Sequence, residues 1–392
     1  MDHFAVPIAT STASAHASRF TGPGGVAEYH LIVLPTEYGG IEQQLAAVHE
    51  AYRDALAHLG IAVRTAIHRR YFCSDVVNQR AVLEARALSS ASGANEPCAI
   101  SWVGQPPSPP AKVALWAYHI SDPAGELDKN HEGTSLTLRR GDLAHHWTTG
   151  VICPEANTSY DQTRGILAQY ETCLSSWGST LADNVIRTWF LVQNVDANYH
   201  GLVVARREVF AERGLTPETH YIASTGIEGY NAEISARVTM DAYAISGVGP
   251  EQVRYLAALD HLSPTHVYGV TFERGASVSY ADRAHVYISG TASIDKHGEI
   301  MHVGDVTRQL DRTLENVEAL LSQAGATLAD MCSFIVYVRD PSDHAIAWER
   351  MRRRFPEAPV VVVVAPVCRP GWLIEVEGTA VVRAEGPGLP RF

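Results

Sequence analysis

Two glutamates near the C-terminus have the spacing of a proton-donating pair. Glu375 and Glu377 alternate with Ile374 and Val376, and in an extended strand this alternation puts both carboxyl groups on one face. Two carboxylates on one face raise each other's pKa, which favours a proton donor near neutral pH. The pair therefore indicates general acid chemistry. The alternative is an edge strand whose acidic face lies in solvent.

A cysteine and an arginine come shortly before this pair. Cys368 stands seven residues before Glu375 and is followed directly by Arg369. If the two side chains are close, the arginine's charge favours the thiolate form of the cysteine. None of the chain's six cysteines forms a C-x-x-C pair, and no Cys/His cluster has the spacing of metal ligands. We expect no structural metal.

Arg187 interrupts an apolar run that includes Ile186 and Trp189. A guanidinium group is costly to bury unless its charge is paired, and its planar fork suits carboxylates. Arg187 thus indicates either a structural ion pair or a clamp for a substrate carboxylate. Arg206 and Arg207 follow on the next predicted helix, and we expect one of them to reach the same cleft while the other faces solvent.

A short polar loop, Thr271-Phe272-Glu273-Arg274-Gly275, precedes another predicted strand. Glycine has no Cβ, so Gly275 would let the backbone approach a ligand closely. The alternative for the charged residues is that Glu273 and Arg274 pair only with each other.

The composition describes an ordinary globular protein with an acidic balance. Apolar residues make up 46% and charged residues 19% of the 392 residues. The net charge of -12 argues against a nucleic-acid partner, and any anionic substrate would need a locally basic pocket. The N-terminus lacks an export pattern, and the valine run 360–364 is too short to cross a membrane. We expect a cytoplasmic protein with a small anionic substrate and no membrane partner.

The elements that must position these side chains recur three times along the chain. Leu181-Ala182-Asp183 matches Leu328-Ala329-Asp330, each between an amphipathic helix and an apolar strand, and residues 60–75 align with 325–340 without a gap. This alignment equates Arg69, Arg187 and Phe334. We predict an N-terminal segment at 1–24 and three repeats at 25–122, 135–245 and 265–385.

The third repeat resembles the Rid/YjgF family. The resemblance rests on three stretches: residues 286–295, 304–308 and 365–377. It implies an α+β fold in which each repeat is a sheet with helices packed on one face. Three such repeats would form a covalent pseudo-trimer, either monomeric or weakly self-associating. It also implies a site between repeats with Glu375 at its floor, as a potential acid.

Imine-hydrolysing members of that family carry an arginine fifteen residues before the glutamate. Val360 stands at that position here, so the usual clamp for a 2-iminoacid is absent from this repeat unless Arg369 or an arginine of another repeat replaces it.

The chorismatases, a family of multi-repeat Rid-like chains, resemble this sequence at more positions. The matches are Arg187-Thr188-Trp189, Arg206, Phe272 to Gly275, Ser289-Gly290-Thr291-Ala292, and the spacing of Cys368 and Glu375. The cysteine spacing and Gly275 are typical of the members that aromatise their product.

This resemblance implies cleavage of chorismate to pyruvate and a hydroxybenzoate, with 3-hydroxybenzoate favoured and no metal or organic cofactor. Glu375 would be the general acid, and Cys368 would assist aromatisation. The substrate-binding residues it implies are Arg187, Arg206, Arg274, Gly275, Thr291, Ala292 and Arg369. Two alternatives stay open: a Rid-type enamine or imine deaminase, and a non-catalytic protein that binds a small ligand.

Overall fold

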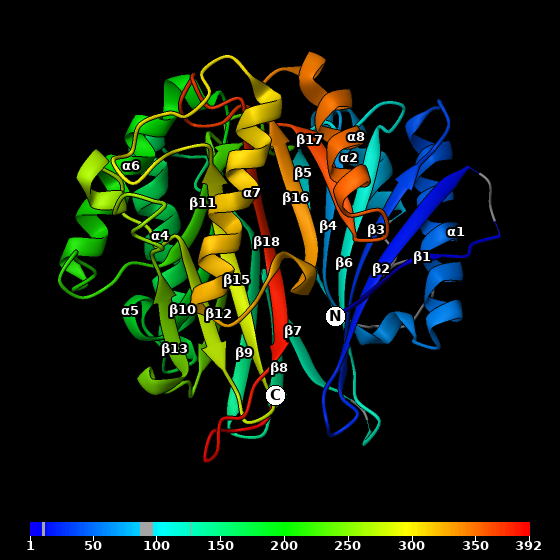
Figure 1. Ribbon diagram of the computed structural model, residues 1–392, viewed down its shortest axis with the longest axis horizontal. Helices are drawn as coiled ribbons and strands as arrows, with labels where there is room; N and C mark the ends of the chain where they lie inside the picture. Colours follow the sequence, from blue (N-terminus) through cyan, green and yellow to red (C-terminus); the bar gives the residue numbers. More distant parts are fainter. Residues whose placement is uncertain (10–11, 87–96, 126) are drawn as a thin grey trace.

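A computed structural model describes residues 1–9, 12–86, 97–125 and 127–392 of the chain, and its strands form three six-stranded sheets (Figure 1). Each sheet has the same strand order. Numbered within its own repeat, the order is first, second, third, sixth, fourth, fifth. Identical topology in three consecutive segments confirms the α+β fold of three Rid-like repeats.

The first sheet is flanked by helices α1 (Ile41–Leu59) and α2 (Val76–Ala85) and the short turn η1 (Val63–Thr65). Its strands, in spatial order, are β1 (Asp2–Val6), β2 (Ala13–Thr21), β3 (Ala27–Pro35), β6 (Val113–Ser121), β4 (Ala66–Cys73) and β5 (Ala99–Gly104).

The second sheet carries α4 (Ser159–Ser176), the one-turn helix α5 (Leu181–Asn184) and α6 (Val195–Glu212). Its strands, in spatial order, are β7 (Asp128–Glu132), β8 (Ser135–Arg140), β9 (Leu143–Val151), β12 (Val238–Ser246), β10 (Val185–Val192) and β11 (Ala223–Glu228).

The third sheet carries α7 (Val306–Gln323) and α8 (His344–Arg354). Its strands, in spatial order, are β13 (Val253–Leu256), β14 (Gly275–Ser279), β15 (Arg283–Ala292), β18 (Ile374–Arg383), β16 (Met331–Val338) and β17 (Val360–Val364). Short 3₁₀ turns complete this part of the chain: η2 (Pro250–Gln252), η3 (Thr265–Tyr268), η4 (Leu328–Asp330) and η5 (Pro341–Asp343).

Helix α7 shows why these segments fold as they do. Asp305 caps its first turn by accepting a hydrogen bond from the backbone N–H of Arg308. Its apolar residues recur every three or four positions and are buried against the sheet: Leu310, Leu314, Val317 and Leu321. The sequence pattern predicted this face of the helix, and the structure confirms it.

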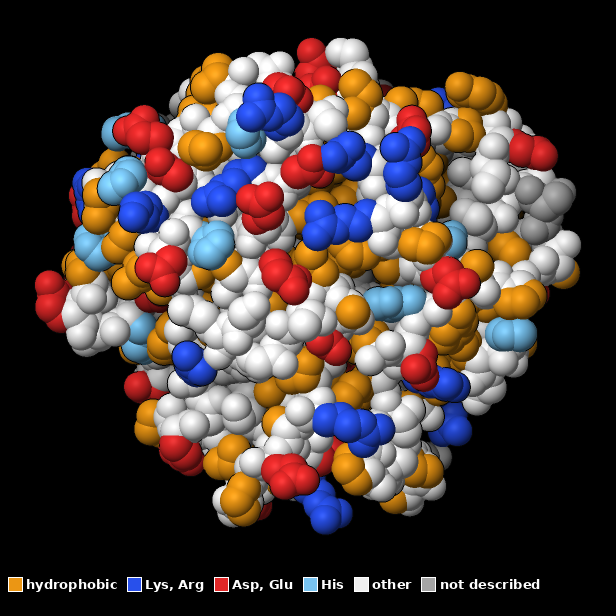
Figure 2. Space-filling model, in the orientation of Figure 1, with side chains coloured by type: hydrophobic (Ala, Val, Ile, Leu, Met, Phe, Trp, Pro, Cys, Tyr) orange, Lys and Arg blue, Asp and Glu red, His pale blue; other side chains and the backbone are white. Residues whose placement is uncertain are grey.

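The helices lie on the outside of the molecule and the three sheets turn towards its centre. Figure 1 shows α1 at the right, α4 and α6 at the left, and α7 in front. Two of the buried clusters draw residues from all three repeats, so the repeats share one core. On the face shown in Figure 2, acidic and basic side chains are interspersed. No helix of the described residues is long and apolar enough to cross a membrane.

The expected repeat boundaries at 25, 135 and 265 fall inside the sheets. Strands β1 and β2 lie within 1–24 and belong to the first sheet, while β7 and β13 precede 135 and 265 and belong to the second and third. The strand β7 is almost wholly exposed, so its sequence lacks the apolar alternation that would have revealed it.

The expected equivalence of Arg69, Arg187 and Phe334 is wrong for Arg187. In the strand pairing, Thr188 is the residue that corresponds to Phe334 and Arg69, because β10 pairs with β12 one residue out of the predicted register. The cause is the turn before the strand, which has four residues in α5 and three in η4. A one-residue slip moves a side chain to the other face of a sheet.

Candidate active site

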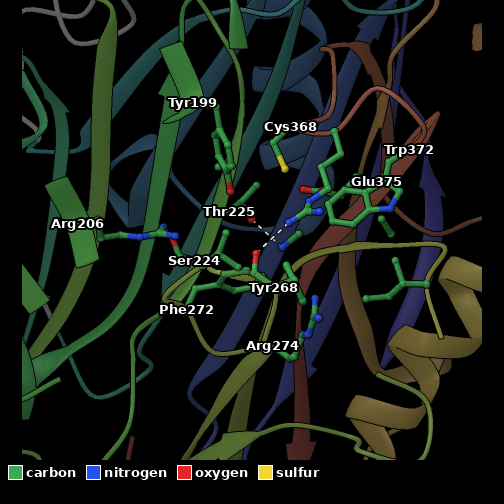
Figure 3. Close-up of a pocket in the computed structure, with 16 residues that line it drawn as sticks. Tyr199, Arg206, Ser224, Thr225, Tyr268, Phe272, Arg274, Cys368, Trp372 and Glu375 are labelled. Atoms are coloured by element: carbon green, nitrogen blue, oxygen red, sulfur yellow. Dashed lines mark hydrogen bonds between the residues drawn. The ribbon is translucent and has the colours of Figure 1, made fainter. Parts of the chain in front are cut away.

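A cavity lies between the second and third repeats and encloses about 470 Å³ of space not occupied by protein atoms. Repeat 2 contributes residues of α6 and β11, and repeat 3 contributes residues of β15, β18 and the loops beside them. Figure 3 places Arg206 and Glu375 on opposite sides of this cavity, with Tyr199 and Cys368 above and Phe272 and Arg274 below.

Glu375 provides the acid of the cavity. It lies on β18, which pairs with β15 on one side and β16 on the other, and only 4% of the residue is exposed. The solvated edge strand considered from the sequence is therefore wrong. Burial, and next the negative charge of Glu377, raise the pKa of Glu375 to about 8. The carboxyl group is mainly protonated at neutral pH and can donate a proton.

Gly290 on β15 makes the space for this acid. A Cβ atom at position 290 would lie 1.9 Å from Oε1 of Glu375, so a larger residue would displace the carboxyl group. Two other residues of the Ser-Gly-Thr-Ala motif, Thr291 and Ala292, differ in whether they reach the cavity. Ala292 lines the cavity, whereas Thr291 is fully buried and its hydroxyl donates to the backbone carbonyl of Ser289.

Glu377 is held as a buried anion behind the cavity. Its carboxylate accepts hydrogen bonds from Arg187 Nη2 at 2.7 Å, from Trp189 Nε1 at 2.9 Å and from the hydroxyl of Thr225. These three donors come from repeat 2, and Arg70 of repeat 1 lies 3.9 Å from the same carboxylate. Glu377 and Glu375 lie on the same face of the strand, as the alternation predicted. Both are buried, and the charge of Glu377 acts on Glu375.

Arg187 does not line the cavity. Its guanidinium is buried, ion-paired with Glu377 and hydrogen-bonded to the hydroxyl of Thr225. Of the two interpretations offered by the sequence, the geometry supports the structural ion pair, and the substrate clamp is not supported.

Three other arginines surround the cavity, and among the described residues none of them forms an ion pair. Arg206 is 1% exposed and reaches Thr271 Oγ1 at 3.3 Å and Ser224 Oγ at 3.4 Å, while its Nη2 atom has no partner. Arg274 donates to the carbonyl of Ser263 at 3.0 Å, and its Nε atom has no partner. The alternative that Glu273 and Arg274 pair with each other is wrong for the described residues, since Glu273 instead accepts from the backbone N–H of Tyr221.

The third arginine, Arg369, is held by aromatic rings. Its guanidinium lies 4.9 Å from the ring centre of Tyr268 and 5.3 Å from that of Trp372. Arg274 lies 5.4 Å from the rings of both Tyr268 and Phe272. Stacking fixes the planes of these forks while leaving donors for a ligand. Arg207, the neighbour of Arg206, is exposed, as expected.

Cys368 lines the cavity as a neutral thiol. Burial, and next the nearby Glu375, raise its pKa to about 12, and the charge of Arg369 counteracts this only weakly. The expected thiolate character is therefore wrong. The hydroxyl of Tyr199 and the guanidinium of Arg206 are close enough to the thiol to influence its pKa. All three side chains line the cavity.

Gly275 does not face the cavity. On β14 its missing side chain avoids the backbone carbonyl of Tyr287, from which a Cβ would be 2.9 Å away, so this glycine serves strand packing. The sequence did not identify several lining residues as site residues, and these are Tyr199, Ser224, Thr225, Gly226, Tyr268, Val270, Phe272, Gly290, Ile294 and Trp372.

Tyr199 left a signal in the sequence. It stands seven residues before Arg206, two helical turns along the same face of α6. Thr225 left none, because β11 reaches the cavity only through its pairing in the second sheet. In the described parts of the chain, no group of three or more His, Cys, Asp or Glu side chains is arranged to hold a metal ion.

Comparison with known proteins agrees with this architecture. The family model described as Endoribonuclease L-PSP matches residues 276–382. The 3-aminoacrylate deaminase RutC of Acinetobacter baylyi is 34% identical over 98 residues, which are 24% of this chain and 77% of that protein. A RutC family protein of Pyrococcus abyssi is 36% identical over 98 residues, or 76% of its length.

Two further matches are to a 3-hydroxybenzoate synthase and to a chorismatase. The 3-hydroxybenzoate synthase of Streptomyces hygroscopicus is 37% identical over 103 residues, and the match spans 24% of this chain but only 30% of that synthase. A crystal structure of a chorismatase superposes with a TM-score of 0.60 and 20% identity, covering 81% of this chain and 93% of that one. At this identity the likeness concerns the fold. The chain belongs to the Rid/YjgF family, as a member with three repeats in the fold of a chorismatase.

Proposed function

We propose that this protein cleaves the enolpyruvyl ether of chorismate, with Glu375 as the general acid. One observation supports the proposal: a buried, protonated carboxyl group shares a cavity with three arginines that have no carboxylate partner in the described parts of the chain. Chorismate is a dicarboxylate with an acid-labile enol ether, so it would bring two negative charges to this excess of positive charge and present the bond that an acid breaks.

In this mechanism the arginines bind and Glu375 acts. Arg206 and Arg274 have unused donors inside the cavity, so we assign them to the substrate carboxylates. Glu375 transfers its proton to the methylene carbon of the enolpyruvyl group, which forms an oxocarbenium ion. Water adds to this ion, and the hemiketal that forms releases pyruvate while the ether oxygen stays on ring carbon 3. Loss of the neighbouring ring hydroxyl group and one ring hydrogen as water then gives 3-hydroxybenzoate, and without this loss the ring product is the dihydrodiol. Orientation in the closed cavity and one positioned acid supply most of the catalysis.

The two possible ring products, a hydroxybenzoate and a dihydrodiol, differ by one molecule of water. Pyruvate plus a hydroxybenzoate has the same atoms as chorismate, whereas pyruvate plus a dihydrodiol contains one more water. We assign Cys368 to the first route, because its neutral thiol lies in the cavity beside Glu375. The match with a 3-hydroxybenzoate synthase supports 3-hydroxybenzoate as the product.

Product analysis tests the proposal directly. The purified chain is incubated with chorismate, and pyruvate and aromatic products are separated by chromatography and identified by mass. Equal amounts of pyruvate and 3-hydroxybenzoate are expected. Release of ammonia from 2-aminoacrylate, with chorismate unchanged, would instead identify a deaminase. If the protein catalysed neither of these reactions, a ligand-binding role would be favoured.

A further inference from the structure

A second cavity lies at the centre of the molecule, where the three sheets meet. It encloses about 430 Å³ of space not occupied by protein atoms, and we call it the central chamber. Its lining residues come from all three repeats and are Glu28, His30, His68, Trp116, Tyr118, Trp147, Trp189, Tyr243, His285, Tyr287, Thr379 and Val381. The first cavity, which contains Glu375 and is called the acid cavity from here on, is a separate space. Glu375 and the arginines of the acid cavity are not among the residues that line the central chamber.

The central chamber lies where equivalent positions of the three repeats converge. The strand pairings equate His30, Trp147 and Tyr287, which face Tyr118, Tyr243 and Thr379 on the neighbouring strands. Five of these six positions carry a ring. The chamber therefore has flat walls on several sides, which suit a planar ligand.

Repeat 1 supplies three buried polar atoms that have no hydrogen-bond partner among the residues that the structure describes: Nδ1 of His30, Nε2 of His68 and Nε1 of Trp116. The Trp116 ring lies 5.2 Å from that of His68 and 5.8 Å from that of His30. Burial lowers the pKa of both histidines to about 3, so both rings are neutral. An indole N–H donor beside two neutral imidazoles matches a hydroxyl group, which accepts from one and donates to the other.

The charges around the chamber are already balanced. Glu28 accepts hydrogen bonds from Arg283 at 2.6 Å and from Tyr118 at 2.6 Å. Arg70 covers the aromatic faces of Trp116 and Trp189 and pairs with Asp241 at 2.9 Å. A cationic ligand would meet the positive charge of Arg70, and an anion would find no unpaired cation among the lining residues.

We propose that the central chamber is a second ligand site, which binds a small neutral hydroxyaromatic compound of the phenol class through Trp116, His30 and His68. This site is independent of the proposed chorismate cleavage. Trp189 lines the chamber and donates its N–H to Glu377, the neighbour of Glu375 on β18.

A heavy-atom probe locates the occupant. Crystals of the full chain are soaked at neutral pH with 4-bromophenol, which is uncharged there, and the bromine is located by its anomalous signal. We expect the bromine in the central chamber and the phenol oxygen within hydrogen-bond distance of Trp116 Nε1. Bromine found only in the acid cavity, or a chamber that contains only water, would overturn the proposal.

Titration calorimetry with phenol tests the contacts in solution. Trp116→Phe keeps the ring and removes the N–H donor, so affinity should fall about threefold to tenfold. Thr379→Leu fills the chamber from the opposite wall and should weaken binding further; it also serves if Trp116→Phe does not fold. Trp372→Phe, in the acid cavity, is the matched control and should leave phenol affinity unchanged. Wild-type affinity in both chamber variants would refute the site.

Discussion

Glu377 and Asp241 occupy the same register position in the third and second sheets, and each is buried against the preceding repeat. Glu377 binds Arg187 and Thr225 of repeat 2, and Asp241 binds Arg70 at 2.9 Å and Ser101 at 2.6 Å in repeat 1. Two interfaces of the pseudo-trimer are thus joined by the same kind of ion pair, with a hydroxyl donor at equivalent places on β11 and β5.

The two interfaces differ at the position two residues before Glu377 and Asp241 in the sequence. Where the third repeat has Glu375, the second has Thr239 and the first has Ala114. At the remaining interface, Trp116 takes the place of the anion and faces a repeat that has Ile335 and Val361 there instead of an arginine and a hydroxyl. The buried anion therefore occurs at two interfaces, and an additional carboxyl group, that of Glu375, occurs at one of the three equivalent positions.

Replacing the acid should have the largest effect on activity. Glu375→Gln keeps the shape of the side chain but cannot deliver a proton, so turnover of chorismate should fall by about 10²–10⁴-fold. The matched control is Thr239→Val at the equivalent position of the second repeat, which should leave turnover unchanged. Pyruvate release measures both. Near wild-type turnover in Glu375→Gln would remove Glu375 as the acid and make Glu377 the next candidate.

The two buried arginines of repeat 2 should respond in opposite ways. Arg187→Met removes the nearest cation from the buried Glu377, which keeps only Arg70 at 3.9 Å, and should lower the free energy of unfolding by about 3–5 kcal/mol. Arg206→Gln removes a buried cation that has no carboxylate partner, so stability should hold or rise. Its affinity for chorismate should nevertheless fall about 10-fold to 100-fold, because a charge-assisted hydrogen bond is lost.

Denaturant unfolding and substrate titration separate these effects. Arg70→Met, at the corresponding ion pair of repeat 1, should destabilise the chain as Arg187→Met does. If Arg187→Met weakened chorismate binding without changing stability, the residue would be a substrate clamp after all.

The pH dependence of turnover should reveal the influence of Glu377 on the acid. Only the protonated form of Glu375 can donate, so the rate should fall about tenfold per pH unit above a pKa of about 8. Glu377→Gln removes the adjacent negative charge and leaves the positive charge of Arg187. The loss of the negative charge and the remaining positive charge together lower the pKa of Glu375, so the decline in turnover should begin at a lower pH.

Asp241→Asn provides the comparison for that shift. It removes the equivalent buried charge at the other interface and carries the same structural penalty. Arg70, the partner of Asp241, also lies 3.9 Å from Glu377, so the pH profile of Asp241→Asn should shift less than that of Glu377→Gln. Equal profiles in Glu377→Gln and the wild type would show that burial alone sets the pKa of Glu375.

The residues that line the acid cavity could be predicted from the sequence where they belong to short motifs. Glu375, Cys368, Arg369, Arg274, Arg206 and Ala292 all line it, and the alternation of residues in β18 indicated that both glutamates share a face. Arg187 was misplaced because one extra residue in the preceding turn shifts the strand register, and no local pattern reports the length of that turn. Gly290 matters through a contact between two strands that lie more than eighty residues apart in the sequence.

The smallest change concerns the product and not the rate. Cys368→Ala removes one sulfur atom from a site where the thiol is close to Tyr199, and the acid and the arginines remain in place. We expect a folded enzyme that still releases pyruvate but shifts its ring product from hydroxybenzoate towards a dihydrodiol, which is heavier by one water. Cys173→Ala, a half-buried cysteine on α4 away from the cavity, is the control and should leave the product unchanged. Mass analysis of the ring product distinguishes the two. An unchanged hydroxybenzoate fraction in Cys368→Ala would mean that the cavity shape, and not the thiol, directs aromatisation.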